Sequence, residues 1–294
     1  MKQRLQSQRH STGFGSFSDV IAGILVALWM LLASCAKPDP LATYLSNLPD
    51  SVEVSFQIGL PGAQSTTAYQ QDKQVPSASI IKVPILIALM EDVQTGKWAL
   101  SEEIVLKESD RVGGAGELQY QEPGSAYTLE FLAREMIRIS DNTATNLLIQ
   151  SVEMERIQDW LKRNGFRQTQ LNRLMMDFDA ITAGRQNYTS AEEMVRMLLE
   201  LFEGKYLDAK GTAFVLELLM DCADRDAIPS QLPDGTAVAH KTGTLDYVRG
   251  DAGLFLGEHP LALCVFVEGF SSLEQADEII GQIARLAFDT YGSK

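Results

Sequence analysis

Strand patterns and helix patterns occupy different parts of this 294-residue chain. Val52 to Ile58 alternates apolar and polar residues, which is the period of a half-buried strand, and a second strand should run to about Tyr69. Near the other end, Ala237 to Thr244, Val248 to Leu256 and Leu261 to Phe266 are predicted to be three strands, with a hairpin turn at Gly257 to Pro260 between the last two. Because these strands need a shared core, we expect one antiparallel sheet built from both chain ends.

The residues between these strands have helical patterns. The stretch from Ser79 to about Gln94 is apolar nearly all round, so a helix there should be central and buried. Thr128 and Ser190 are suitable N-caps for two further helices, over Leu129 to Ile139 and Ala191 to Phe202. The remaining predicted helices cover Pro38 to Leu48, Ala144 to Ser151, Ile157 to Arg163, Gly211 to Cys222 and Leu273 to Tyr291.

This order of elements predicts an α/β fold of the α+β kind, with helices flanking the sheet and an all-helical lobe inserted. Residues 38–72 and 228–294 would form the α/β lobe, and residues 73–227 the helical lobe. The formal net charge of −14 argues against nucleic acid as a partner. It also makes local Lys or Arg side chains necessary wherever an anionic substrate docks.

The N-terminal segment is typical of an export signal. Val20 to Leu32 is an apolar run about as long as a signal h-region, and three basic residues precede it, Lys2, Arg4 and Arg9. Leu32-Ala33-Ser34-Cys35 resembles a lipobox, in which the cysteine takes a lipid and the preceding segment is removed. We therefore expect residues 1–34 to be a lipoprotein-type signal peptide and Cys35 to anchor the protein on the periplasmic or extracytoplasmic side of a membrane. The alternative, an uncleaved anchor helix, gives the same location.

The other cysteines and the histidines do not suggest a metal or redox centre. An export compartment allows a disulfide between Cys222 and Cys264, but each lies in an apolar stretch, which favours two buried thiols. No C-x-x-C occurs, and the three histidines are scattered at His10, His240 and His259. This spacing cannot assemble a metal site, and we expect no metal and no cofactor.

Three short motifs follow one another along the chain: Ser79-Ile80-Ile81-Lys82, Ser140-Asp141-Asn142 and Lys241-Thr242-Gly243. Ser79 and Lys82 lie three apart at a helix start, so they share one face, where the serine N–H can point to an oxyanion. A lysine buried beside the serine loses its proton more easily than in water and can act as a base. The alternative is a capping serine with a surface lysine. The apolar helix around Lys82 argues against it.

The other two motifs also have ordinary structural explanations. Ser140-Asp141-Asn142 lies between two predicted helices, where these residue types are common N-caps. Lys241 to Thr244 lies on a predicted strand, and Gly243 would let a neighbouring backbone approach closely. Arg249, on the next strand, is either a surface arginine or a group that binds a substrate carboxylate.

Together the motifs resemble those of the penicillin-recognising serine hydrolases, which include class A β-lactamases and penicillin-binding proteins. The resemblance covers nearly all of the chain after the signal segment. It implies that Ser79 is the nucleophile, that Lys82 is a base and that Ser140 relays a proton to the leaving nitrogen. Asp141 would hold its loop, and Lys241 would also hold Ser140 through a hydrogen bond. The implied substrate-binding residues are Asn142, Lys241, Thr242 and Thr244, the last through its N–H in the oxyanion site.

One part of the family pattern is missing. Class A enzymes carry a loop glutamate, in an E-x-x-L-N context, that activates the water releasing the acyl-enzyme. Here Gln170-Leu171-Asn172-Arg173 resembles the start of that loop, and counting onward puts Met175 at the glutamate position. No Glu lies between Glu155 and Glu192, so only Asp177 and Asp179 offer a carboxylate in this loop. Because an aspartate is one methylene shorter, its reach as a general base is reduced.

Three functions are open at this point. The first is a class A-like β-lactamase that opens the β-lactam ring through an acyl-enzyme on Ser79. The second is a D-alanyl-D-alanine carboxypeptidase, that is, a penicillin-binding protein acting on cell-wall peptides. The third is a lipid-anchored module that takes up a β-lactam covalently without efficient turnover. Chain length and the Ser-Asp-Asn motif favour the first, which we expect to act as a monomer, whereas the missing glutamate favours the other two.

Overall fold

The computed structural model describes residues 39–63 and 67–292. The predicted signal peptide and the lipidation site at Cys35 lie outside these residues. The chain divides into two units, residues 1–47 and 48–294. In the first unit, the described residues contain helix α2 (Pro40–Leu45), whose N-cap Asp39 accepts a hydrogen bond from the Leu41 N–H. All elements described below belong to the second unit.

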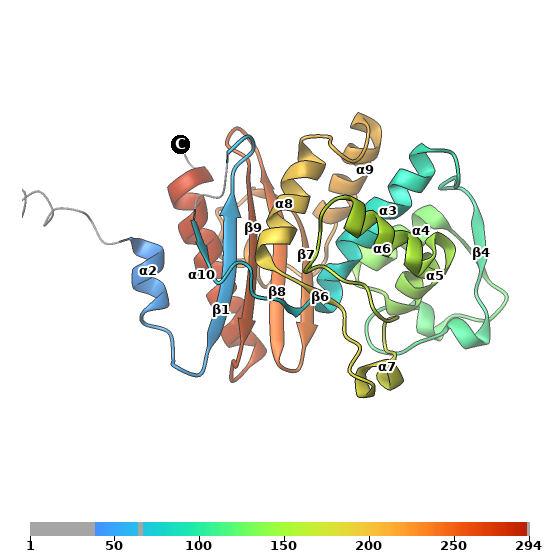
Figure 1. Cartoon of the computed structure of the whole chain (residues 1–294), viewed down its shortest axis with the longest axis horizontal. Coiled ribbons are helices and arrows are strands. Elements are labelled where there is room, and N and C mark those ends of the chain that lie inside the picture. The colour runs from blue at the N-terminus through green and yellow to red at the C-terminus, as the bar shows by residue number, and fades with distance from the viewer. Residues whose placement is uncertain (1–38, 64–66, 293–294) are drawn as a thin grey trace, which may run out of the picture. The chain divides into compact units, whose positions relative to one another are not determined.

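A five-stranded antiparallel sheet forms the centre of the second unit (Figure 1). Its strand order is β2-β1-β9-β8-β7. The strands are β1 (Glu53–Gly59), β2 (Thr67–Tyr69), β7 (Ala237–Leu245), β8 (Val248–Leu256) and β9 (Leu261–Glu268). Two strands from the N-terminal part thus pair with three from the C-terminal part, and β1 joins β9 along its whole length. The predicted sheet is confirmed.

Helices cover both faces of this sheet. Strand β8 is buried at every position except its last, and such continuous burial requires cover on both sides. Helix α8 (Ala191–Phe202) packs against β1, β8 and β9 on one face, and α10 (Leu273–Ala287) packs against β8 and β9 on the other (Figure 1). Ser190 caps α8 as predicted, by accepting a hydrogen bond from the Glu193 N–H. The last helix ends earlier than predicted, because a π-helical turn replaces it over Phe288–Gly292.

Most of the other helices lie between the two sets of strands in sequence. They are α3 (Lys82–Gln94), α4 (Leu129–Arg138), α5 (Asn142–Val152), α6 (Met154–Arg163), α7 (Phe178–Thr182) and α9 (Ala209–Met220). Two small antiparallel pairs accompany them, β3 (Val75–Pro76) with β6 (Tyr188–Thr189) and β4 (Glu103–Val105) with β5 (Ala126–Thr128). Ten of the 13 residues of α3 are buried, and it contacts α4, α5, α6 and α9. The prediction of a central, buried helix is therefore confirmed.

Both described cysteines, Cys222 and Cys264, are buried free thiols, so the disulfide that the compartment would allow is not formed. Burial raises the pKa of both thiols, which lowers their reactivity. Within residues 39–63 and 67–292, no helix is long and apolar enough to cross a membrane. The same residues contain no cluster of three or more His, Cys, Asp or Glu side chains placed to hold a metal ion.

The segment before α3 lies directly against the sheet. It begins as a 3₁₀ turn, η1 (Ala78–Ile81), which contacts β7 and β8, so the helix predicted from Ser79 becomes α-helical only at Lys82. Gly243 on β7 makes this approach possible. A Cβ atom at Gly243 would lie 3.0 Å from the Ser77 carbonyl oxygen and 3.0 Å from the Ala78 Cβ. The absence of a side chain at Gly243 therefore sets how close η1 can lie to β7.

Replacing Gly243 by Ala should lower the thermal unfolding temperature, because the added methyl group forces η1 away from β7. The expected cost is about 1–3 kcal/mol, the usual range for overpacking. Gly113→Ala is a matched control, because a Cβ there would meet only the Gln119 Oε1 atom, 3.7 Å away. Equal unfolding temperatures for the two variants would show that the contact between η1 and β7 is not tight.

Candidate active site

The three sequence motifs meet at one cavity of about 450 Å³. Ser79 comes from η1, Ser140 from the connection between α4 and α5, and residues 241–244 from β7. The other lining residues are Ala115, Arg138, Ile139, Cys222, Ala223 and Asp224. Since β7 is an edge strand of the sheet, its free side can pair with an extended substrate.

Ser79 is the second residue of η1 and is half-buried at the cavity wall. Its backbone N–H lies in the first turn, where helical N–H groups have no partner within the helix. Such an N–H can donate to an oxyanion that forms on a carbon attacked by the Ser79 hydroxyl. The position therefore suits both a nucleophile and half of an oxyanion site.

Lys82 is completely buried and connects η1 and α3 to the second motif. Its Nζ atom donates to the Ser140 carbonyl oxygen at 2.7 Å, to the Ser140 Oγ at 3.0 Å and to the Asn142 Oδ1 at 3.0 Å. Burial, followed by the charge of Lys241, lowers the pKa of Lys82 well below its ordinary value, against the opposing effect of Asp141. Lys82 therefore loses its proton more easily than a lysine in water, and its neutral amine can act as a base. The alternative of a surface lysine is wrong.

The Ser140-Asp141-Asn142 motif serves both structure and chemistry. Asp141 is fully buried and is the N-cap of α5; its carboxylate accepts from the N–H groups of Ala144, Glu117 and Leu118 at 2.8, 2.7 and 2.9 Å. This is the loop-holding task expected for it. Ser140 and Asn142 instead turn to Lys82, and the Asn142 Nδ2 donates to the Gly113 carbonyl oxygen at 3.1 Å.

Three residues near the motifs have an unusual backbone conformation. Ala78, Ser140 and Met176 have φ angles of 45°, 59° and 60°, a region that favours glycine. Such conformations cost about 1–3 kcal/mol each and persist only where the surroundings impose them, often at active sites. A Cβ at Gly114 would lie 3.0 Å from the Met176 sulfur and 2.7 Å from the Asn142 Nδ2, so Met176 and Asn142 both lie close to Gly114.

Lys241 is buried and differs from its expected role in one respect. Its Nζ atom donates to the Thr242 carbonyl oxygen at 3.0 Å, and no hydrogen bond to Ser140 is found among the described residues. The Ser140 hydroxyl is occupied by Lys82 instead. Burial lowers the pKa of Lys241 from its ordinary value, although Cys222 and other acidic groups oppose this effect.

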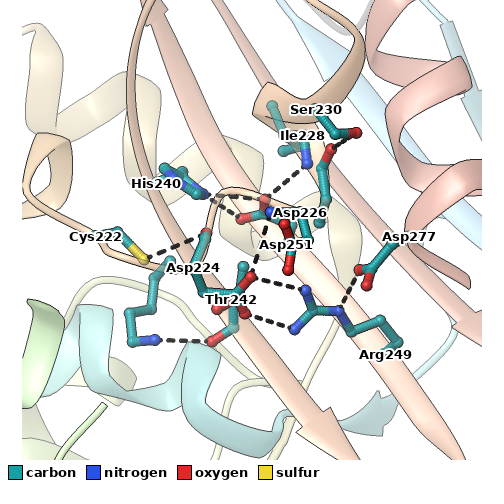
Figure 2. A network of polar contacts seen from close by, with 12 residues as sticks. Cys222, Asp224, Asp226, Ile228, Ser230, His240, Thr242, Arg249, Asp251 and Asp277 are labelled. Atoms are coloured by element: carbon teal, nitrogen blue, oxygen red, sulfur yellow. Dashed lines mark hydrogen bonds and ion pairs between the residues drawn. The ribbon is translucent and has the colours of Figure 1, made fainter. Parts of the chain in front are cut away.

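Arg249 is only 2% exposed, so it is not a surface arginine. Its Nε donates to Asp277 at 2.7 Å, and its two terminal nitrogens donate to the two oxygens of Asp224 at 2.9 and 3.2 Å (Figure 2). One of these nitrogens also donates to the Thr244 Oγ1 at 2.8 Å. Burial opposes the charge, but the two aspartates raise the pKa of Arg249 above its ordinary value. The motifs gave no indication of Asp224, which was not among the predicted site residues.

The loop that lacks a glutamate is held through its backbone at Met175. The Met175 N–H donates to the Asn146 Oδ1 at 2.8 Å, and its carbonyl oxygen accepts from the Asn146 Nδ2 at 3.1 Å. Asp177 caps α7 by accepting from the Ala180 N–H at 2.8 Å. None of these loop residues lines the cavity. Within the described part of the chain, Asp224 is the only carboxylate among the lining residues.

Several known proteins resemble this chain in sequence and structure. The model of the Beta-lactamase enzyme family matches residues 41–291. Beta-lactamase VEB-1 of Pseudomonas aeruginosa is 23% identical, over 94% of this chain and 98% of that protein. A β-lactamase structure from Sphaerobacter thermophilus is 29% identical with a TM-score of 0.76, covering 82% of this chain and 92% of that one. The structure of PBP-A is 26% identical with a TM-score of 0.78, covering 84% of this chain and 92% of that one.

These likenesses confirm the expected fold, with its antiparallel sheet and surrounding helices. The matched segment includes all three motifs and nearly all of the described elements. The chain therefore belongs to the β-lactamase enzyme family.

Proposed function

We propose that this protein is a serine hydrolase that opens the β-lactam ring, a cyclic amide, through an acyl-enzyme on Ser79. The observation that carries this proposal is the buried amine of Lys82, which joins Ser140 and Asn142 beside Ser79. In the first step, the Ser79 Oγ bonds to the carbonyl carbon and the carbon–nitrogen bond breaks. The serine proton passes to the leaving nitrogen, with Lys82 as base and Ser140 as relay.

The remaining site residues have the chemistry to bind and polarise the substrate. The N–H groups of Ser79 and Thr244 would hold the carbonyl oxygen as it becomes negative, and Asn142 would bind the substrate amide. Lys241 and Thr242 would contribute charge and a hydroxyl from β7. Because one chain supplies all three motifs to the cavity, we propose that the protein acts as a monomer.

The likeness to a protein that reacts with penicillin supports this reaction. A point mutant of PBP-A has been solved as an acyl-enzyme complex with penicillin G, and its structure is 26% identical to this chain with a TM-score of 0.78. Deacylation has less support from the site, because Met175 and Asp177 do not line the cavity. We therefore propose that acylation is faster than release of the product.

Incubation with a slowly released β-lactam should add one ligand mass to the protein, and Ser79→Ala should abolish the adduct. Intact mass spectrometry measures both. Lys82→Ala should slow acylation by a factor of ~10² to 10⁴, the usual contribution of a positioned base. An adduct that persists in Ser79→Ala would show that another residue is acylated.

With a chromogenic cephalosporin, rapid mixing should show a burst of product followed by a slower steady state, because the acyl-enzyme accumulates. Asp177→Asn should change neither phase. Asparagine is an equally good N-cap for α7, and the Asp177 carboxylate is engaged with that helix rather than the cavity. A longer acyl-enzyme lifetime in Asp177→Asn would identify this residue as a base. Fast turnover without a burst would mean that another group activates water.

We also propose that a lipid on Cys35 holds the protein on the periplasmic or extracytoplasmic side of a membrane. The support is the lipobox-like Leu32-Ala33-Ser34-Cys35 after an apolar run. Palmitate labelling of expressing cells should mark the wild type and should be lost in Cys35→Ser. Cys264→Ala is the control, because that thiol is buried in β9 and should not be lipidated. Equal labelling of the wild type and Cys35→Ser would exclude this anchor.

A further inference from the structure

The cavity contains a carboxylate that the acylation chemistry does not use. Asp224 follows α9 and lines the cavity beside residues 241–244 of β7. Its side chain is 39% exposed, so a substrate in the cavity can approach its charge. The side chain is nevertheless held in place, because both terminal nitrogens of Arg249 donate to it (Figure 2).

Asp224 is bound to Arg249, whose guanidinium group could otherwise bind a carboxylate of the substrate. Arg249 grips both Asp224 oxygens, at 2.9 and 3.2 Å, in the two-pronged arrangement that guanidinium groups form with carboxylates. The Thr242 side chain contributes to lowering the pKa of the same carboxylate. The sequence suggested Arg249 as a group that binds a substrate carboxylate, and Lys241 and Thr242 as substrate-binding residues on the neighbouring strand. In this chain, the partner of Arg249 is the carboxylate of Asp224.

These contacts keep the Asp224 side chain ionised. Burial alone would raise its pKa, but the hydrogen bonds and charge of Arg249, together with Thr242, lower the pKa of Asp224 to about 2. At neutral pH the side chain is therefore fully negative. So weak a base cannot efficiently activate water, so its effect on a substrate is electrostatic.

The other cations that line the cavity are paired or buried. Arg138 is paired with Glu135 through two hydrogen bonds of 2.9 and 2.7 Å. Lys241 is only 1% exposed and donates to a backbone carbonyl. A carboxylate entering next to Thr242 would therefore meet the negative charge of Asp224 at short range. The energy of such like-charge contacts is large in a partly buried site.

We propose that Asp224 determines specificity, by selecting acyl donors with an uncharged group beside the scissile nitrogen over donors with a free carboxylate there. Esters, amides and a peptide chain that continues past the scissile bond are the chemical classes that fit. This inference rests on the proposed acylation of Ser79, and it names the substrate class of that same site.

The test compares a penicillin that has its free carboxylate with the methyl ester of the same penicillin. The rate of mass addition at Ser79 is measured for both compounds in the wild type, Asp224→Asn and Asp226→Asn. Asp226 is an exposed neighbour, and its replacement removes the same charge without touching Arg249 or Thr242. Asp226→Asn is therefore a matched control for a general change in the electrostatic field at the cavity.

Asp224→Asn should raise the acylation rate of the free acid by ~10- to 100-fold, because a like charge at contact range is removed and Arg249 is released. The rate with the methyl ester should stay within about threefold of the wild type, since an uncharged group does not feel the change. Asp226→Asn should leave both rates close to those of the wild type.

The inference is wrong if Asp224→Asn alters both rates equally, alters neither, or slows the free acid. Thermal unfolding reports whether the variant is folded, and Asp224→Ser replaces it if Asp224→Asn is not. Failure of the methyl ester and the acid alike to label Ser79 in any variant would instead count against the proposed function. Labelling without discrimination between the two compounds would count only against the role of Asp224.

Discussion

The hydrogen bonds of one buried amine hold the site together. Lys82 lies at the start of α3, and its three contacts reach Ser140 and Asn142, on either side of the cap of α5. A buried ammonium without partners would cost several kcal/mol, so the chain must bring these oxygens to it. This requirement ties the central helix to the α4–α5 connection and brings the Ser140 hydroxyl to the Lys82 nitrogen. The strained backbone at Ser140 is held by these contacts and by the buried cap at Asp141.

The second constraint is the approach of η1 to the sheet. Gly243 faces the turn that carries Ser79, and Gly250 beside it on β8 leaves room for Phe266 and Ile80. Together these two glycines allow a helical turn to lie directly against two strands. Ser79 is therefore positioned by rigid elements, a sheet edge and a buried helix, rather than by a loop. Ser79 and Thr244 line the same cavity from these two elements.

Local patterns were sufficient to predict the architecture and most of the site. Alternation in β1 and the strand-like stretches of β7 to β9 predicted the sheet, and the apolar helix around Lys82 indicated that this lysine is buried. Hydrogen bonds and ion pairs between residues far apart in the sequence were not predictable. Arg249 and Asp224 are 25 residues apart, and nothing in their spacing shows that they meet. The hydrogen bond that Lys241 donates to the Thr242 carbonyl oxygen, and not to Ser140, was also not predictable. It depends on the fact that Lys82 already donates to the Ser140 hydroxyl.

The two hydrogen bonds between the Asn146 side chain and the Met175 backbone affect how this loop can evolve. Both of its hydrogen bonds run to backbone atoms of Met175, so they do not depend on which side chain residue 175 carries. Mutation can exchange that side chain while the loop keeps its path. A carboxylate side chain could thus be introduced at residue 175 without loss of the two hydrogen bonds that hold the loop.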